Sequence, residues 1–260
     1  MIVPFVASEA SQERLDGCRE AALFLRQTLH RAVILAQGTG ERWGTCVMQS
    51  IGLDATQAGV GTLKGFRQLG GDDGCPTVAW ISECPLLSGG FFRIPIEDSH
   101  MVTIESAVRL KGWWATLTTT ALLGDPTPNH EVLIRARDET LDAIEELAAP
   151  GIELRALSKV IADGARKHSL GIALDLTGHG IGQWLQERPM VDVVPSANAS
   201  PLQSGQVLSI QFVYAMTPED TFVTKTARDG FGRHAPEWVP GLHASVMLLV
   251  GDESAEMVRA

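Results

Sequence analysis

The stretch that most constrains this chain is Thr177–Gly182, which reads TGHGIG and is followed by Glu187 and Pro189. One histidine, His179, stands among three glycines. Glycine lets a backbone turn tightly, and it lets another group approach closely because it has no Cβ. Glycines bury no side chain, so such a stretch builds a core poorly. We therefore interpret it as part of a functional site, the simpler alternative being a glycine-rich turn with a bystander histidine.

The composition of the 260 residues excludes several classes of protein. The net charge is -10 and Lys and Arg form no block, so a nucleic-acid backbone would be repelled and no nucleic-acid partner is expected. No apolar run reaches the ~18 residues that a membrane span requires, so no membrane partner is expected either. The first residues lack the basic and long apolar segments of a signal peptide, which predicts a cytoplasmic protein. The four cysteines form no C-x-x-C pair, so zinc-finger spacing is absent.

Three helices are predicted from local patterns. Apolar residues recur at steps of three and four from about Ser11 to about Leu35, as on one face of an amphipathic helix. Thr127 followed by Pro128 is typical of an N-cap and a first helical position, and this second helix is expected to stop at Pro150-Gly151. A third helix is predicted from about Glu153. Residues 38–75 are rich in glycine, and only a turn at 70–74 is predicted there.

Strands are predicted where Val, Ile, Thr and aromatic residues concentrate. The segments Met101–Leu110 and Trp113–Leu123, separated by Lys111-Gly112, are typical of a hairpin. Further strands are expected at Thr77–Ser82, Val207–Tyr214 and His243–Val250. No proline-rich linker divides the chain, which predicts a single domain over residues 1–260. The predicted class is α+β, with an antiparallel sheet that helices cover on one face.

Four stretches, in chain order, resemble the M24-like, pita-bread family of methionine aminopeptidases, prolidases and creatinase. Residues 102–120 resemble its paired-aspartate hairpin, and Gly178–Pro189 resembles its G-H-G-I-G…E-x-P signature. Leu202–Gln211 and His243–Val250 resemble the two strands that complete its site. The resemblance implies a pita-bread fold over roughly residues 11–255, a hydrolase acting on C–N bonds, and a homodimer as in relatives without extra domains.

In the metallopeptidases of this family, two aspartates, one histidine and two glutamates hold two divalent ions. The resemblance places these five positions at Glu105, Thr116, His179, Gln211 and His243. A further histidine of the family falls at Gln186, and the one ahead of the first aspartate has no counterpart in Leu86–Gly90. Two divalent ions carry four positive charges, whereas Glu105 is the only anion among the five residues. Three uncompensated charges in a partly desolvated pocket would cost many kcal/mol, so we do not expect a dinuclear metal centre.

Two chemistries fit the remaining residues. In the first, His179 and His243 are acid/base groups, Glu105 orients them and no cofactor is needed, as in creatinase, which hydrolyses a C–N bond without an ion. In the second, the same three residues hold one Fe, Mn or Zn ion in an enzyme that could be redox-active. A third hypothesis, from another class, is a binding module that uses the cleft to hold a peptide or ligand without catalysis.

The expected enzyme is a hydrolase or lyase that acts on a small amino-acid-derived or peptide-like molecule by C–N hydrolysis or a related proton-transfer step. Thr116, Gln211 and Gln186 are predicted to make polar contacts with this molecule. Trp114 and Trp184 are predicted to line the cavity, and the neighbouring Trp113 faces the opposite side of its strand. Glu187 is either a general acid or part of a solvated ion pair with Arg188. The loop Thr217–Pro240 is expected to be a lid or a dimer contact.

Overall fold

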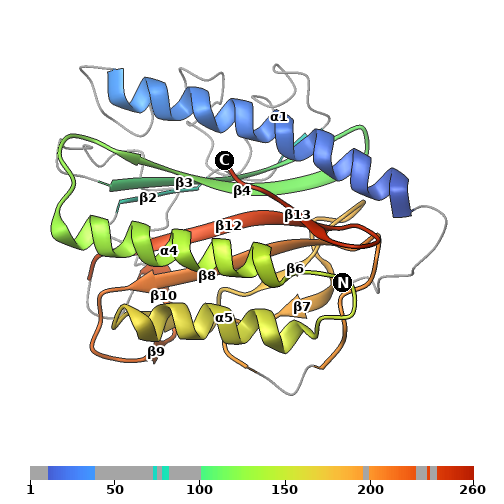
Figure 1. Ribbon diagram of the computed structural model, residues 1–260. Helices are drawn as coiled ribbons and strands as arrows, with labels where there is room; N and C mark the ends of the chain where they lie inside the picture. Colours follow the sequence, from blue (N-terminus) through green and yellow to red (C-terminus); the bar gives the residue numbers. More distant parts are fainter. Residues whose placement is uncertain are drawn as a thin grey trace.

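The computed structural model describes residues 11–38, 73–74, 78–81, 101–195, 199–226, 233–234 and 239–260. Two large sheets, antiparallel except for the pairing of β5 with β9, lie between two helical layers, with α1 over one sheet and α4 and α5 over the other (Figure 1). In the described residues, β10 and β11 form a separate two-stranded sheet. In the described part of the chain, no helix is long and apolar enough to cross a membrane. The elements are α1 Ser11–Gly38, β1 Asp73–Gly74, β2 Val78–Ile81, β3 Met101–Leu110, β4 Trp113–Leu122, α4 Pro128–Leu147, α5 Leu154–Lys167, β5 Gly171–Ala173, β6 Gly178–Gly180, β7 Glu187–Val191, β8 Val207–Ala215, β9 Thr221–Phe222, β10 Lys225–Thr226, β11 Arg233–His234, β12 Gly241–Val250 and β13 Ala255–Val258.

The first sheet is built on the β3–β4 hairpin, which confirms the prediction for this segment. Lys111 and Gly112 have φ of 49° and 86°, the positive values that a two-residue hairpin turn demands. Strand β2 confirms the strand predicted near residues 77–82 and pairs with β3. The turn predicted at 70–74 is wrong for its last two residues, because Asp73 and Gly74 form the strand β1, which pairs with the edge of β3. Backbone N–H and C=O groups at the edge of β3 need hydrogen-bond partners, and pairing with Asp73-Gly74 supplies them.

The second sheet is centred on the long antiparallel pair β8–β12, as predicted from two apolar runs. The prediction that only one sheet face is covered is wrong for these strands, since both are buried on both faces. One face of the pair packs against α4 and α5 through residues such as Phe212, Tyr214 and Leu248. The other face packs against α1 and the hairpin through Val207, Met247 and Leu249. Near-continuous apolar runs are the sequence pattern of such doubly covered strands.

The helices follow their local signals closely. Thr127 caps α4 by accepting a hydrogen bond from the backbone N–H of His130, and Pro128 is the first helical residue, as predicted. Helix α5 begins at Leu154, directly after the predicted start at Glu153. Helix α1 extends three residues beyond the predicted end, to Gly38.

Cys18 of α1 is a buried free thiol, and burial raises its pKa to about 12, which leaves it protonated and unreactive at neutral pH.

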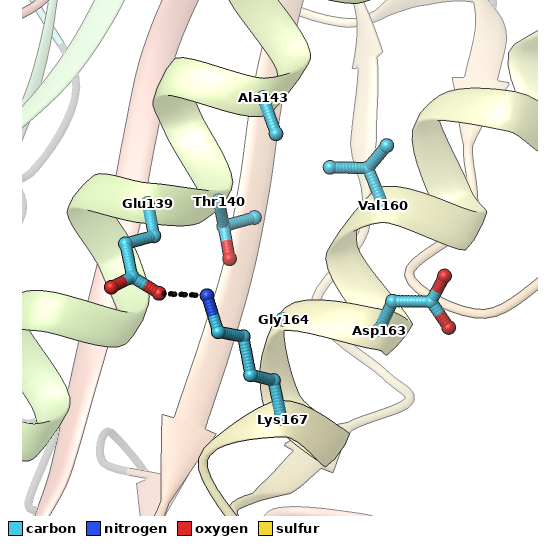
Figure 2. A pocket seen from close by; sticks show the side chains of 7 residues that line it. All are labelled: Glu139, Thr140, Ala143, Val160, Asp163, Gly164 and Lys167. Atoms are coloured by element: carbon cyan, nitrogen blue, oxygen red, sulfur yellow. Dashed lines mark ion pairs between the residues drawn. The ribbon is translucent and has the colours of Figure 1, made fainter.

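Helices α4 and α5 approach each other closely at Gly164. A Cβ at this position would collide with the Thr140 hydroxyl of α4 and lie 2.7 Å from the Tyr214 hydroxyl oxygen of β8. Beside this contact lies a hollow of about 240 Å³, lined by Glu139, Thr140, Ala143, Val160, Asp163, Gly164 and Lys167 (Figure 2). An ion pair between the Glu139 carboxylate and the Lys167 ammonium group lines the hollow, with Oε2 and Nζ 2.9 Å apart. The hollow lies on the helix side of the β8–β12 sheet.

We predict that Gly164→Ala destabilises the protein although alanine favours helices by about 1 kcal/mol. Overpacking at a closed contact costs about 1–3 kcal/mol and should outweigh that gain. Urea unfolding should show a net loss of about 1–2 kcal/mol, part of which Thr140→Ala recovers in the double variant. An alanine variant as stable as the parent would contradict the close packing of α4 against α5.

Candidate active site

The glycines of the TGHGIG stretch permit close approach of other strands. Residues 178–180 form the strand β6, which lies between β7 and β8, so the alternative of a glycine-rich turn does not hold for these residues. A Cβ at Gly178 would lie 2.5 Å from the carbonyl oxygen of Ser209, and a Cβ at Gly180 would collide with the carbonyl oxygen of Arg188. Both obstacles are backbone atoms that cannot move aside cheaply. The alternative use of glycine, close approach of another group, is therefore the one that the structure shows.

His179 is held between these glycines and is 4% exposed. Its Nδ1 lies 2.9 Å from the carbonyl oxygen of Gly180. A carbonyl oxygen only accepts, so Nδ1 carries the proton and Nε2 keeps its lone pair in the neutral ring. Burial lowers the pKa of His179, and the Gly180 hydrogen bond and the charges of Glu105 and Glu187 oppose this more weakly. The imidazole is thus neutral at pH 7 and has a basic nitrogen available.

A row of polar residues occupies the hairpin-facing side of β8 and β12. Ser209 and Gln211 alternate with core residues on β8, and Ser245 lies directly opposite Gln211 on β12. The Gln211 amide donates a hydrogen bond of 2.9 Å to the Ser209 hydroxyl oxygen. The backbone N–H of Ser245 donates to the Thr118 hydroxyl oxygen at 2.9 Å, which connects β12 to β4. The row is uncharged, and Ser209 and Ser245 are fully buried.

Glu105 and His243 meet across the two sheets. Nδ1 of His243 lies 3.3 Å from Oε2 of Glu105, and the side chains are 2% and 21% exposed. Register places Thr118 opposite Glu105 in the hairpin, and Thr116 lies two residues away on the same strand face. The structure therefore brings Glu105 and His243 into contact, with Thr116 on the Glu105 face of the hairpin and Gln211 on the His243 face of the β8–β12 pair.

The donor chemistry of the site is mostly neutral. One carboxylate, two imidazoles, an amide and a hydroxyl occupy the five positions that the resemblance assigns to metal ligands. Within the described ranges, no three His, Cys, Asp or Glu side chains gather as ligands of one ion would. Glu105, His179 and His243 are accordingly not arranged as a three-ligand face. Residues 86–90, where the family has another histidine, lie outside the described residues.

The remaining predicted contacts lie farther out. Trp184 is 60% exposed, and Gln186 is exposed beside it in the segment between β6 and β7. Trp114 is half-buried and shares a strand face with Thr116, whereas Trp113 faces α1 at Gly17. Of the loop 217–240, residues 227–232 and 235–238 lie outside the described ranges, and the described parts form β9, β10 and β11.

Sequence reasoning assigned Glu187 the wrong neighbour. The solvated pair with Arg188 is wrong, because Glu187 is 2% exposed and its Oε2 lies 2.5 Å from Nη1 of Arg14 in α1. No individual role was predicted from the sequence for Arg14, Thr118, Ser209 or Ser245, which form hydrogen bonds at or beside the site. Only the strand alternation from Gln211 to Ser209 offered a signal for any of them. The pairing of Arg14 with Glu187 depends on chain segments distant in sequence.

Comparison with known proteins decides the family. The model of metallopeptidase family M24 matches residues 55–251. The chain belongs to this family. The match covers the hairpin, β6, β8 and β12, which carry the residues described above.

The M24 chain is similar in sequence to methionine aminopeptidases. It is 28% identical to methionine aminopeptidase 1D of Arabidopsis thaliana over 117 residues, which cover 45% of this chain and 33% of that protein. It is 27% identical to the enzyme of Mycoplasma capricolum over 164 residues, 62% and 64% of the two chains. With the enzyme of Aquifex aeolicus it shares 23% identity over 218 residues, 81% and 83%. The matched part of the chain thus spans 33% of the length of the Arabidopsis protein and 64% of that of the Mycoplasma protein.

Solved structures of the family confirm the pita-bread fold. Methionine aminopeptidase from Thermotoga maritima superposes with a TM-score of 0.80 at 16% identity, covering 99% of each chain. Prolidase from Pyrococcus furiosus gives a TM-score of 0.69 at 15% identity, covering 100% of this chain and 65% of that one. Because the identities are so low, these likenesses establish the fold and nothing further.

The lowered pKa of His179 predicts a pH-dependent stability. Above its ordinary value of 6.5 the ring is neutral in both states; below 6.5 the unfolded chain binds a proton that the buried ring resists. Stability is therefore lost as the pH falls from 6.5 toward the folded-state pKa. Between pH 7.5 and 5.5 the melting temperature should fall less in His179→Gln than in the parent, by roughly 2–4 °C for each kcal/mol of this loss. The exposed His30→Gln is the matched control, and equal losses in all three proteins would contradict the prediction.

Proposed function

We propose that this M24 chain is a hydrolase that cleaves a C–N bond in a small amino-acid-derived or peptide-like molecule without a dinuclear metal centre. The observation that carries the proposal is the 3.3 Å contact of Oε2 of Glu105 with Nδ1 of His243, together with the neutral His179, on whose pKa the charge of Glu105 acts. Family membership supports a peptide-like substrate. The chemistry would be creatinase-like, and the proposal includes the cytoplasmic location and the homodimer expected from the sequence.

In the proposed reaction an imidazole acts first as base and then as acid. It accepts a proton from a water molecule while the water oxygen bonds to the electrophilic carbon of the substrate. It then returns this proton to the nitrogen atom as the C–N bond breaks, so that an amine leaves. Glu105 stabilises the imidazolium form of His243 between the two steps, as an orienting carboxylate does in a catalytic triad. The lowered pKa of His179 suits it to accept a proton at neutral pH.

Neutral polar residues are proposed to orient the substrate. Thr116 and Gln211 offer a hydroxyl and an amide, both able to donate and to accept hydrogen bonds. An amide or carboxylate group of a peptide-like molecule can be recognised by such groups without a metal ion. Gln186, Trp114 and Trp184 are proposed to contact the more distant parts of the substrate.

The donor set does not fit the family's pair of divalent ions. A single carboxylate, Glu105, would have to offset four positive charges beside the buried imidazole of His243. A single-ion site at Glu105, His179 and His243 is less favoured, because the described side chains are not gathered as ligands. We therefore assign these three residues to proton transfer and orientation.

Turnover with matched variants tests the proposal. Chelator-treated protein should hydrolyse at least one member of a panel of methionyl peptides, Xaa-Pro dipeptides and guanidino acids. Glu105→Gln and His243→Asn should lower kcat by about 100-fold or more, and His179→Ala should abolish turnover. The surface pair His168 and Glu139, 2.8 Å apart, provides the matched controls His168→Asn and Glu139→Gln, which should leave kcat unchanged.

Two outcomes would contradict this assignment. A rate that survives in His179→Ala would remove the imidazole chemistry. A panel without any turnover, together with a ligand that raises the melting temperature, would instead assign the chain a binding role.

Restoring carboxylates should restore metal binding. We predict that the variant Thr116→Asp, Gln211→Glu, His243→Glu gains Mn²⁺ binding, because these changes supply the missing negative charge. Its melting temperature should rise by roughly 5–10 °C when free Mn²⁺ exceeds the dissociation constant a hundredfold. The parent chain should show no such rise. About two equivalents of Mn²⁺ bound by the parent would contradict the proposal.

A further inference from the structure

An ion pair between α1 and β7 holds the segment that follows His179. We call residues 181–186, between β6 and β7, the β6–β7 turn. Nη1 of Arg14 lies 2.5 Å from Oε2 of Glu187, and it also donates to the carbonyl oxygen of Ile181 at 3.3 Å. The other carboxylate oxygen of Glu187 accepts a hydrogen bond of 3.1 Å from the backbone N–H of Trp184. The pair thus contacts the start, the middle and the end of the turn.

The ion pair is enclosed by the groups around it. A Cβ at Gly182 would lie 2.5 Å from Nη1 of Arg14 and 2.8 Å from Oε1 of Glu187, so the turn passes directly over the pair. The guanidinium carbon of Arg14 lies 6.0 Å from the Trp113 ring centroid, within the range of a cation–π contact. The carbonyl oxygen of Gly182 accepts a 2.7 Å hydrogen bond from the backbone N–H of Trp114. This hydrogen bond also fixes the turn relative to β4.

The turn is linked to the ring of His179 through one backbone carbonyl. Nδ1 of His179 donates to the carbonyl oxygen of Gly180, and the next residue, Ile181, is the one that Arg14 holds. The backbone N–H of Ile181 also donates to Val207 of β8. A displaced turn would move the Gly180 carbonyl, and the imidazole would then lose the partner that decides which nitrogen carries the proton.

We propose that Arg14 and Glu187 are positioning residues that fix the tautomer and orientation of His179 from α1. Removing one partner leaves the other charge buried, which favours displacement of the turn. The effect on catalysis rests on the proposed function, whereas the effect on the tautomer does not. Arg14 lies in α1, ahead of residues 55–251, which the family model matches.

Nitrogen NMR of the histidine ring tests the proposal without a substrate. Long-range ¹H–¹⁵N correlations at pH 7.5, assigned with His179→Gln, should show one Nδ1–H tautomer for His179 in the parent chain. Arg14→Met should shift both ring nitrogens toward averaged values, and Arg14→Lys should restore the parent pattern in part. Arg19→Met is the matched control: it breaks an ion pair of the same helix with Asp16 and Glu256, away from the turn. Its His179 spectrum should equal that of the parent.

A second variant keeps the test decisive if Arg14→Met does not fold. Glu187→Gln removes the charge but retains an oxygen for the Trp184 N–H, and it should disturb the His179 tautomer as well. Folded Arg14→Met or Glu187→Gln protein with the parent ring spectrum would overturn the proposal, and so would an equal change in Arg19→Met.

Kinetics separate this proposal from the proposed function. With a substrate from the panel, Arg14→Met should lower kcat about 10- to 100-fold while KM stays within about twofold, as expected for a misplaced catalytic group. Unchanged kcat with a disturbed tautomer would refute the catalytic role of His179 and leave the positioning role intact. Unchanged kcat with an unchanged tautomer would refute the positioning role.

Discussion

The pairing of β8 with β12 is the constraint on which the rest of the structure depends. Nine residues of each strand are in register, from Val207 with Leu249 to Ala215 with Gly241, and both strands are buried on both faces. The side chains on one face of this strand pair pack against α4 and α5. The other face packs against α1 and the hairpin at one end and carries Gln211 and His243 farther along. Because strand side chains alternate, the same pair of strands supplies both the core and the site.

Charge distinguishes this site from those of metallopeptidases with paired carboxylates. Glu105 is the one carboxylate at the five positions assigned by resemblance, and it extends from the hairpin to His243 of the other sheet. Nδ1 of His243 lies 3.3 Å from the carboxylate, so Glu105 faces an imidazole rather than a second carboxylate. Neutral residues are easier to bury than unpaired charges, and Ser209 and Ser245 are fully buried with hydroxyl partners. The polar character of the site is thus kept at low net charge.

Much of the fold could be predicted because its signals are local. Thr127-Pro128 begins a helix and Lys111-Gly112 closes a hairpin through the geometry of the residues themselves. The candidate site residues were assigned through the resemblance, which gave their positions along the chain. Spacing alone could not place Glu105 beside His243, since their contact crosses two separate sheets. The glycines were predicted to permit close approach of another group, and the backbones of Ser209 and Arg188 lie against Gly178 and Gly180.

The sequence by itself determined the helices, the long strands, the family and the shortage of negative charge at the site, since these follow from residue types and short-range patterns. Only the tertiary structure decided which distant groups meet. Glu187 pairs with Arg14, 173 residues away, rather than with its neighbour Arg188, and Asp73-Gly74 joins a sheet edge rather than a turn. The physical reason is that a buried charge or an unpaired backbone group takes whichever partner the fold brings within hydrogen-bonding distance.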